Sequence, residues 1–211
     1  MGITNLLSLA GGVALGTQIG YRAACALDPR PLPHQFSGLL DHPARLKLRA
    51  PAQTAGVFGY EPGMKVVEVG CGTGTFTVEM ARLVGSTGRV HAVDLQKSMI
   101  DKAHVRVTGA GLADRVRFEH RGAYRLPMQD ASMDLAVLMA VLSEIPDRAL
   151  ALAEIHRVLK PEARLVVGEE IFLPAYLPPK SVRSLVEAAG FRFGGHQGSP
   201  VCYTTIFFKE P

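Results

Sequence analysis

Three glycines at alternate positions, Gly70, Gly72 and Gly74, are the residues of this sequence best suited to holding a ligand. An apolar run, Met64–Val69, leads into them, and a helical pattern at about Phe76–Val84 follows directly. Glycine allows a tight turn and lets the backbone approach a ligand without an intervening Cβ. The N-terminus of the helix offers free N–H groups to a negatively charged group such as a carboxylate. The arrangement therefore predicts a ligand-binding loop between a strand and a helix.

The spacing within this loop excludes two common nucleotide sites. A dinucleotide fingerprint requires a third glycine three residues after the second, and either Thr75 or Thr77 stands there instead. A phosphate-binding P-loop ends in Gly-Lys-Ser/Thr, but no lysine occurs between Lys65 and Lys97. The loop therefore matches neither the dinucleotide-binding nor the phosphate-binding form.

What remains is the pattern Glu68-x-Gly-x-Gly-x-Gly, which resembles the first motif of the class I methyltransferases that depend on S-adenosylmethionine (SAM). The resemblance is to the broad family that contains many small-molecule methyltransferases, including the quinone-biosynthesis type. It extends from about Pro43 to Lys209. Two later stretches add to it: Arg125–Asp134 is similar to the family's run before the fourth strand, and Leu152–Arg164 is similar to its E-I-x-R-V-L-K-P-G-G-R stretch.

The resemblance implies where SAM binds. Asp94 ends a strand at the place of the acidic residue that accepts hydrogen bonds from the ribose hydroxyls, and Leu95 is expected against the adenine. Glu68 is expected to help hold the amino group of the methionine part. The full expected set is Glu68, Gly70, Cys71, Gly72, Gly74, Asp94, Leu95, Gly122, Ala123 and Met139. Gly122 departs from the family, which commonly has an aspartate there that bonds the adenine amino group.

The implied reaction is an in-line displacement of a methyl group from a sulfonium, in which the protein mainly holds the nucleophile close and aligned. A proton acceptor is needed only where the methyl acceptor must lose a proton, and the candidates are Ser143, Glu144 and Tyr124. The histidines show no ligand spacing, so no metal is expected. The expected methyl acceptor is a small, lipophilic molecule. Scattered Lys and Arg residues form no stripe for nucleic acid.

A second hypothesis, of a different class, is a membrane-anchored accessory subunit that keeps the methyltransferase fold with little or no activity. It rests on the missing acid at Gly122 and on the N-terminus. The run Ile3–Tyr21 has nineteen residues without a charge, near the lower length for a bilayer-spanning helix. Gly12, Gly16 and Gly20 would share one face of that helix and permit close helix contacts. Stabilisation by SAM separates the two hypotheses, because an enzyme must bind its cofactor.

Three segments are expected along the chain: an apolar N-terminal segment (1–27), a proline-rich linker (28–42) and the methyltransferase domain (43–211). Residues 1–27 are expected to contact a membrane, to pack as a helix on this or another protein, or to act as a targeting segment. The basic residues that follow would place the domain on the cytoplasmic side of a membrane, or simply in the cytoplasm. Cysteines at Cys25, Cys71 and Cys202 form no pairing pattern, which also indicates a reducing compartment.

Strand-like and helix-like stretches alternate in the part of the chain that must position these residues. After a first helix over Pro43–Gly59, the expected strands are Met64–Val69, Arg89–Asp94, Val116–His120, Met133–Met139, Arg164–Glu169, Phe191–His196 and Cys202–Lys209. The later helices are expected at about Phe76–Val84, Ser98–Gly109, Arg148–Leu159 and Pro178–Ala189. The alternation predicts an α/β fold with a Rossmann-like, doubly wound, mostly parallel seven-stranded sheet. A C-terminal antiparallel hairpin and a preceding apolar N-terminal helix complete the prediction.

Overall fold

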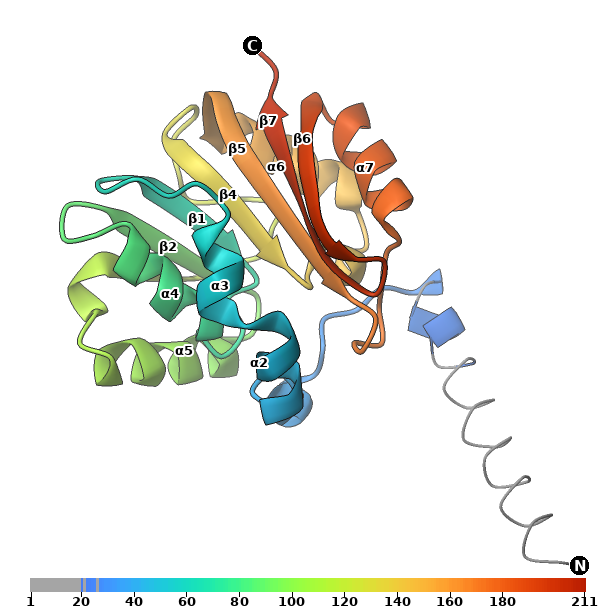
Figure 1. The fold of residues 1–211 in the computed structure, drawn as a ribbon, viewed down its shortest axis with the longest axis horizontal. Helices are drawn as coiled ribbons and strands as arrows, with labels where there is room; N and C mark the ends of the chain where they lie inside the picture. Colours follow the sequence, from blue (N-terminus) through green and yellow to red (C-terminus); the bar gives the residue numbers. More distant parts are fainter. Residues whose placement is uncertain (1–19, 21, 26) are drawn as a thin grey trace, which may run out of the picture.

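A seven-stranded sheet in the order β3-β2-β1-β4-β5-β7-β6 forms the centre of the molecule (Figure 1). The computed structural model describes residue 20, residues 22–25 and residues 27–211. The strands are β1 (Lys65–Val69), β2 (Arg89–Asp94), β3 (Val116–His120), β4 (Met133–Met139), β5 (Leu159–Glu170), β6 (Phe191–Ser199) and β7 (Cys202–Lys209). The first five strands pair in parallel, and β7 is antiparallel to both β5 and β6. This confirms the predicted mixed sheet, whereas most of the predicted N-terminal helix lies outside the described residues.

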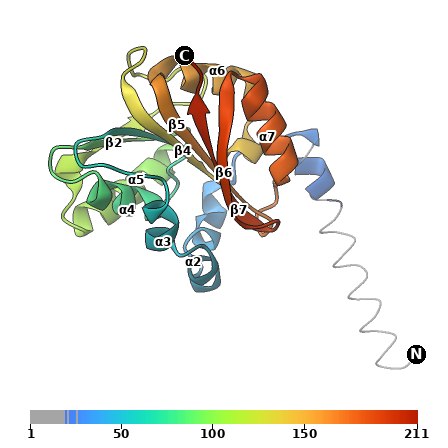
Figure 2. The same cartoon turned by 45° about the horizontal axis from the view of Figure 1, so that its top comes forward.

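Helices cover both faces of the sheet (Figures 1 and 2). One face packs against α4 (Thr75–Leu83) and α5 (Lys97–Gly109), and the other against α6 (Arg148–Val158) and α7 (Pro179–Ala188). Because both faces are covered, the central strands read as continuous apolar runs, and β4 is buried at nearly every position. The structure also contains short 3-10 helices: η1 (His34–Leu39), η2 (Ala113–Arg115) and η3 (Leu142–Glu144).

The helix predicted over Pro43–Gly59 is two helices, α2 (Pro43–Arg49) and α3 (Pro51–Gly56). Ala50 separates them in the left-handed region, with φ of 39°. Pro51 has no N–H to continue the first helix, and a proline disfavours the helical conformation in the residue before it. The prediction of one helix was therefore wrong, and Pro51 was the signal that decides it.

Strand β5 begins five residues before the predicted start at Arg164, because Leu159 leaves α6 directly in an extended conformation. Strand β6 likewise continues past His196 to Ser199 and pairs with Cys202 of β7. The loop between β6 and β7 is therefore the two residues Pro200 and Val201. The extra length brings the hairpin turn beside the carboxyl end of β5, where Glu170 pairs with Cys202.

Helix α2 is fixed to the carboxyl end of β5 by a buried ion-pair cluster. Glu170, with its side chain only 1% exposed, lies 2.7 Å from Nε of Arg45 and 3.0 Å from Nε of Arg49. Arg49 also donates to the carbonyl of Tyr203 at 3.0 Å. Since an uncompensated buried charge is unfavourable, these contacts determine where α2 lies on the sheet.

We expect Glu170→Gln to lower the free energy of unfolding by about 3–5 kcal/mol, because it leaves two buried guanidinium groups without their carboxylate. Glu187→Gln, which removes the exposed pair with Arg183, is the matched control and is expected to change it by less than about 1 kcal/mol. Urea unfolding followed by circular dichroism measures both. Equal effects of the two substitutions would show that the buried cluster does not hold α2.

Candidate functional site

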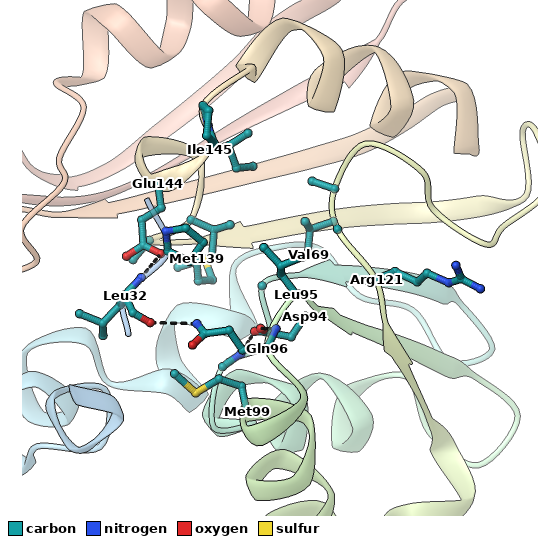
Figure 3. A pocket seen from close by; sticks show the side chains of 18 of the residues that line it. Leu32, Val69, Asp94, Leu95, Gln96, Met99, Arg121, Met139, Glu144 and Ile145 are labelled. Atoms are coloured by element: carbon teal, nitrogen blue, oxygen red, sulfur yellow. Dashed lines mark hydrogen bonds between the residues drawn. The ribbon is translucent and has the colours of Figure 1, made fainter. Parts of the chain in front are cut away.

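A cavity of about 280 Å³ opens at the carboxyl ends of β1, β2 and β4 (Figure 3). Strand β1 lies between β2 and β4 at the point where the strand order reverses, which is where open α/β sheets bind ligands. The cavity wall is mostly apolar. Seven of the expected cofactor residues line it, namely Gly70, Gly72, Asp94, Leu95, Gly122, Ala123 and Met139. Glu68, Cys71 and Gly74 are not among the lining residues.

The glycine loop is pinned to β2 and shaped by positive backbone angles. The N–H groups of Gly70 and Cys71 both donate to the carbonyl of Val93, at 2.8 and 3.0 Å. Gly70, Gly72 and Gly74 have φ of 75°, 53° and 81°, a region that residues with a Cβ rarely adopt. The three alternate glycines in the sequence thus mark a backbone turn that only glycine forms readily.

The third glycine of the loop serves packing rather than ligand contact. A Cβ on Gly74 would lie 2.8 Å from Cα of Ala103 in α5 and 2.9 Å from its Cβ. Helix α4 can therefore begin against α5 only because this position has no side chain.

Asp94 joins the glycine loop to the loop after β2. Its Oδ2 accepts the N–H of Gly72 at 2.9 Å, and its Oδ1 accepts the N–H of Gln96 at 2.8 Å. Burial raises the pKa of Asp94, while these hydrogen bonds to the carboxylate act in the opposite direction. Each carboxylate oxygen has a further lone pair, and the side chain borders the cavity. The geometry therefore suits a ligand that offers two hydroxyl groups.

Glu68 lies behind the glycine loop and is almost completely buried. Its Oε2 accepts the hydroxyl of Thr77 at 2.5 Å. Burial raises the pKa of the Glu68 carboxyl to about 8, and no cation among the described residues offsets that effect. A ligand with an ammonium group near the loop would supply the missing positive charge.

The three candidate proton acceptors occupy different surroundings. Glu144 and Tyr124 both line the cavity, and the Tyr124 hydroxyl accepts the N–H of Asp147 at 3.0 Å. Ser143 does not line it, because its N–H and hydroxyl both donate to Glu169, at 3.0 and 2.8 Å. Only two of the three candidates thus face the cavity.

Residues 31–34, which we call the strap, run beside the cavity, and Pro31 and Leu32 line it. The N–H of Leu32 donates to Oε2 of Glu144 at 3.0 Å (Figure 3). Gln96 binds the strap twice: its Nε2 donates to the carbonyl of Leu32 at 2.9 Å, and its Oε1 accepts the N–H of His34 at 3.0 Å. The strap belongs to the segment expected to be only a linker. The sole hint in the sequence was an apolar leucine between two prolines.

A family model described as "Methyltransferase domain" matches residues 60–187, which is more than half of the chain. The chain belongs to this methyltransferase family. A demethylmenaquinone methyltransferase from Lactiplantibacillus plantarum is 41% identical over 104 residues, which are 49% of this chain and 44% of that protein. The chain thus matches less than half the length of this curated relative. A ubiquinone/menaquinone biosynthesis C-methyltransferase from Psychromonas ingrahamii is 35% identical over 57% of the chain and 47% of its own length.

Solved structures give the same fold over more of the methyltransferase. A SAM-dependent methyltransferase from Aquifex aeolicus superposes with a TM-score of 0.75 and 27% identity, over 84% of this chain and 99% of its own. The [4+2]-cyclase SpnF superposes with a TM-score of 0.68 and 20% identity, over 77% of this chain and 80% of its own. The second match shows the fold alone.

The loop after β3 in this methyltransferase borders an apolar slot of the cavity. Gly122 and Ala123 line it beside Leu95, whose Cδ1 lies 3.6 Å from where a Cβ on Gly122 would be. The N–H of Arg121 donates to the carbonyl of Asp94 at 3.0 Å, which fixes this loop to the end of β2. An aromatic ring can pack against these apolar groups without a side-chain hydrogen bond.

We expect Gly74→Ala to lower the free energy of unfolding by about 1–3 kcal/mol, because it forces a side chain into the left-handed region and against Ala103. Gly56→Ala in α3 is the control, since no atom lies within 4 Å of its new Cβ, and it should stabilise the protein by about 0.5–1 kcal/mol. Chemical unfolding of both variants tests this. A neutral effect of Gly74→Ala would disprove the packing role of this glycine.

Proposed function

We propose that this methyltransferase binds SAM in the cavity and transfers its methyl group to a small, lipophilic acceptor. The observation that carries the proposal is the placement of Asp94, the apolar slot at Leu95 and Ala123, and the buried Glu68 around one loop. In this arrangement Asp94 holds the ribose hydroxyls, the slot holds the adenine, and Glu68 balances the ammonium group from behind Gly70. Bound SAM supplies a methyl group already attached to a positively charged sulfur.

The chain's own residues contribute position and a dry environment. The strap covers the cavity mouth, and Met139 and Ile145 give it apolar walls. Excluding water and holding the acceptor against the methyl group lowers the barrier to in-line displacement. A lipophilic acceptor suits the apolar walls. The quinone-related names of the curated relatives support an acceptor derived from a quinone.

We further propose that the carboxyl edge of the sheet rests on a membrane surface on its cytoplasmic side. Exposed apolar side chains come from elements that meet at this edge, namely Phe36, Leu39, Leu48, Phe172 and Val201. Helix α2 pairs with Glu170 there, and Arg22 donates to the carbonyl of Ile171, so the described chain also begins at this edge (Figure 1). Within the described residues, no helix has both the length and the apolar character needed to cross a bilayer.

The proposed division of the chain follows from this arrangement. Residues 43–211 form the methyltransferase domain, residues 28–42 link to it and supply the strap, and residues 1–27 form the apolar segment that would reach the membrane or a partner helix.

SAM and its demethylated product should each raise the melting temperature of the purified protein in a saturable way. At a hundred times the dissociation constant, binding adds about 2.7 kcal/mol to the free energy of unfolding. Asp94→Ala should abolish the shift, because it removes both the loop contacts and the acceptor for the ribose. Asp114→Ala, at an exposed acid in η2 beyond the far end of the sheet, should leave the shift unchanged.

A folded wild-type sample that responds to neither ligand would overturn the proposal and favour the accessory-subunit hypothesis. A normal shift in Asp94→Ala would show instead that the ribose site lies elsewhere.

Phe36→Ser should weaken binding of the full chain to sedimented vesicles of mixed neutral and anionic phospholipid by about tenfold, because a buried aromatic side chain contributes about 1.5–3 kcal/mol. Leu83→Ser is the control, since this exposed leucine ends α4 at the opposite edge of the sheet. Equal losses in both variants, or no binding by the wild type, would contradict the proposed membrane edge.

A further inference from the structure

Glu144 is a carboxylate set into an otherwise apolar part of the cavity, between Val141 and Ile145 (Figure 3). One of its oxygens, Oε2, accepts the Leu32 N–H of the strap. The other oxygen has no hydrogen-bond partner among the described residues, and it is not one of the fully buried unpaired atoms. It therefore keeps a free lone pair that can be reached from the cavity.

We propose that Glu144 takes the proton that a ring hydroxyl of the acceptor loses during methyl transfer, and that Glu169 is the positioning residue that aims it. The inference rests on the proposed methyl transfer and narrows the acceptor to a reduced, hydroxyl-bearing aromatic ring. A thioether acceptor would need no such group, because it has no proton to lose.

The turn that carries Glu144 is held rigidly from both sides. Glu169, a fully buried residue of β5, accepts the N–H and the hydroxyl of Ser143. Arg148 in α6 donates to the carbonyls of Leu142 at 3.1 Å and Ser143 at 3.0 Å. Ser143 is thus hydrogen-bonded to β5, and the two carbonyls before Glu144 are hydrogen-bonded to α6. These contacts fix the turn so that the Glu144 side chain faces the cavity. Such fixed geometry is what proton transfer at a defined atom requires.

The charges around Glu144 suit a proton acceptor at neutral pH. Burial raises the pKa of its carboxyl to about 7, the nearby Glu169 and Asp94 carboxylates act in the same direction, and the Leu32 N–H opposes them. Arg121 and Tyr124 line the same cavity, and Arg148 is occupied by backbone carbonyls. A base with a pKa near the working pH combines a populated carboxylate with good proton affinity.

The step balances without any further reagent. Glu144 takes the proton of the ring hydroxyl, and the electron pair of that O–H bond moves through the ring to the adjacent carbon, which bonds to the methyl carbon. The electron pair of the methyl–sulfur bond stays on sulfur, which becomes a neutral thioether. The methylated carbon then releases its hydrogen to water as a proton, the ring regains its aromaticity, and the oxygen recovers the proton from Glu144. One proton is released overall.

A simpler role for Glu144 is to hold the strap. Gln96 provides the comparison, because it makes the other two hydrogen bonds to the strap and carries no charge. Glu144→Gln keeps an oxygen that can accept the Leu32 N–H but cannot serve as the base. Gln96→Ala keeps the base and removes strap contacts. The two variants therefore separate the two roles.

The test measures formation of the demethylated cofactor by the full-length protein between pH 5.5 and 9, with SAM and a chemically reduced demethylmenaquinone that carries a short isoprenoid tail. For the wild type, kcat/KM should rise about tenfold per pH unit below the pKa of Glu144 and level off above it, because only the carboxylate accepts a proton. Glu144→Gln should lower kcat by about 100-fold or more and lack this rise, while keeping the SAM-induced melting shift. Gln96→Ala should keep the rise, because it leaves the Glu144 carboxylate in place.

Burial raises the pKa of Glu169 to about 7 as well, so Glu169 is charged over the upper part of this pH range. Glu169→Gln should move the rise to lower pH, because it removes the negative charge that holds the Glu144 pKa up there. A Glu144→Gln enzyme that resembles Gln96→Ala in rate and keeps the rise would overturn the inference while leaving the proposed methyl transfer intact. Failure of the wild type to bind SAM or to transfer a methyl group would overturn both.

Discussion

Burial of carboxylates at one end of a parallel sheet is the constraint on which the rest of this structure depends. Each buried acid needs a donor, and in this chain the donors come from the segments that form the site. Asp94 accepts a hydrogen bond from the glycine loop, and Glu169 accepts one from η3. Glu170 pairs with an arginine of α2, and Glu144 accepts a hydrogen bond from the strap. Three acids at the carboxyl ends of strands and one in η3 thus fix four loops and short helices by the same kind of interaction. The cavity is the space that they leave between them.

Much of the fold could be predicted from the sequence because the central strands are buried on both faces. The strands β2, β3, β4 and β7 have the predicted ends. In β2 and β4 a buried, mostly apolar run bounded by turn residues allows few other interpretations. The break at Pro51 was available in the sequence but was outweighed by the apolar pattern around it. The early start of β5 could not be read from the sequence, because Leu159 joins the sheet through its pairing with Met133 of the distant strand β4.

The candidate site could be predicted where the backbone conformation requires a particular residue type. It could not be predicted where the position of a side chain depends on a contact with a residue far away in the sequence. Glycines with positive φ and an acid at a strand end leave local signals. Ser143 and Glu144 are adjacent in the sequence, yet in the 3-10 turn their side chains diverge, one toward β5 and the other toward the cavity. Leu32 finds its partner 112 residues away, a contact that no local pattern encodes. The superposition on a cyclase makes the same point at a larger scale, since a shared fold leaves the chemistry to such individual contacts.

The long reach of the strap has a consequence for how the molecule folds. Its hydrogen bonds to Gln96 and Glu144 close loops spanning 64 and 112 residues, so the strap cannot dock until β2 and η3 have been made and ordered. The earliest described part of the chain to be synthesised is therefore among the last to reach its place. Until the strap docks, the pocket of a nascent chain lacks this cover.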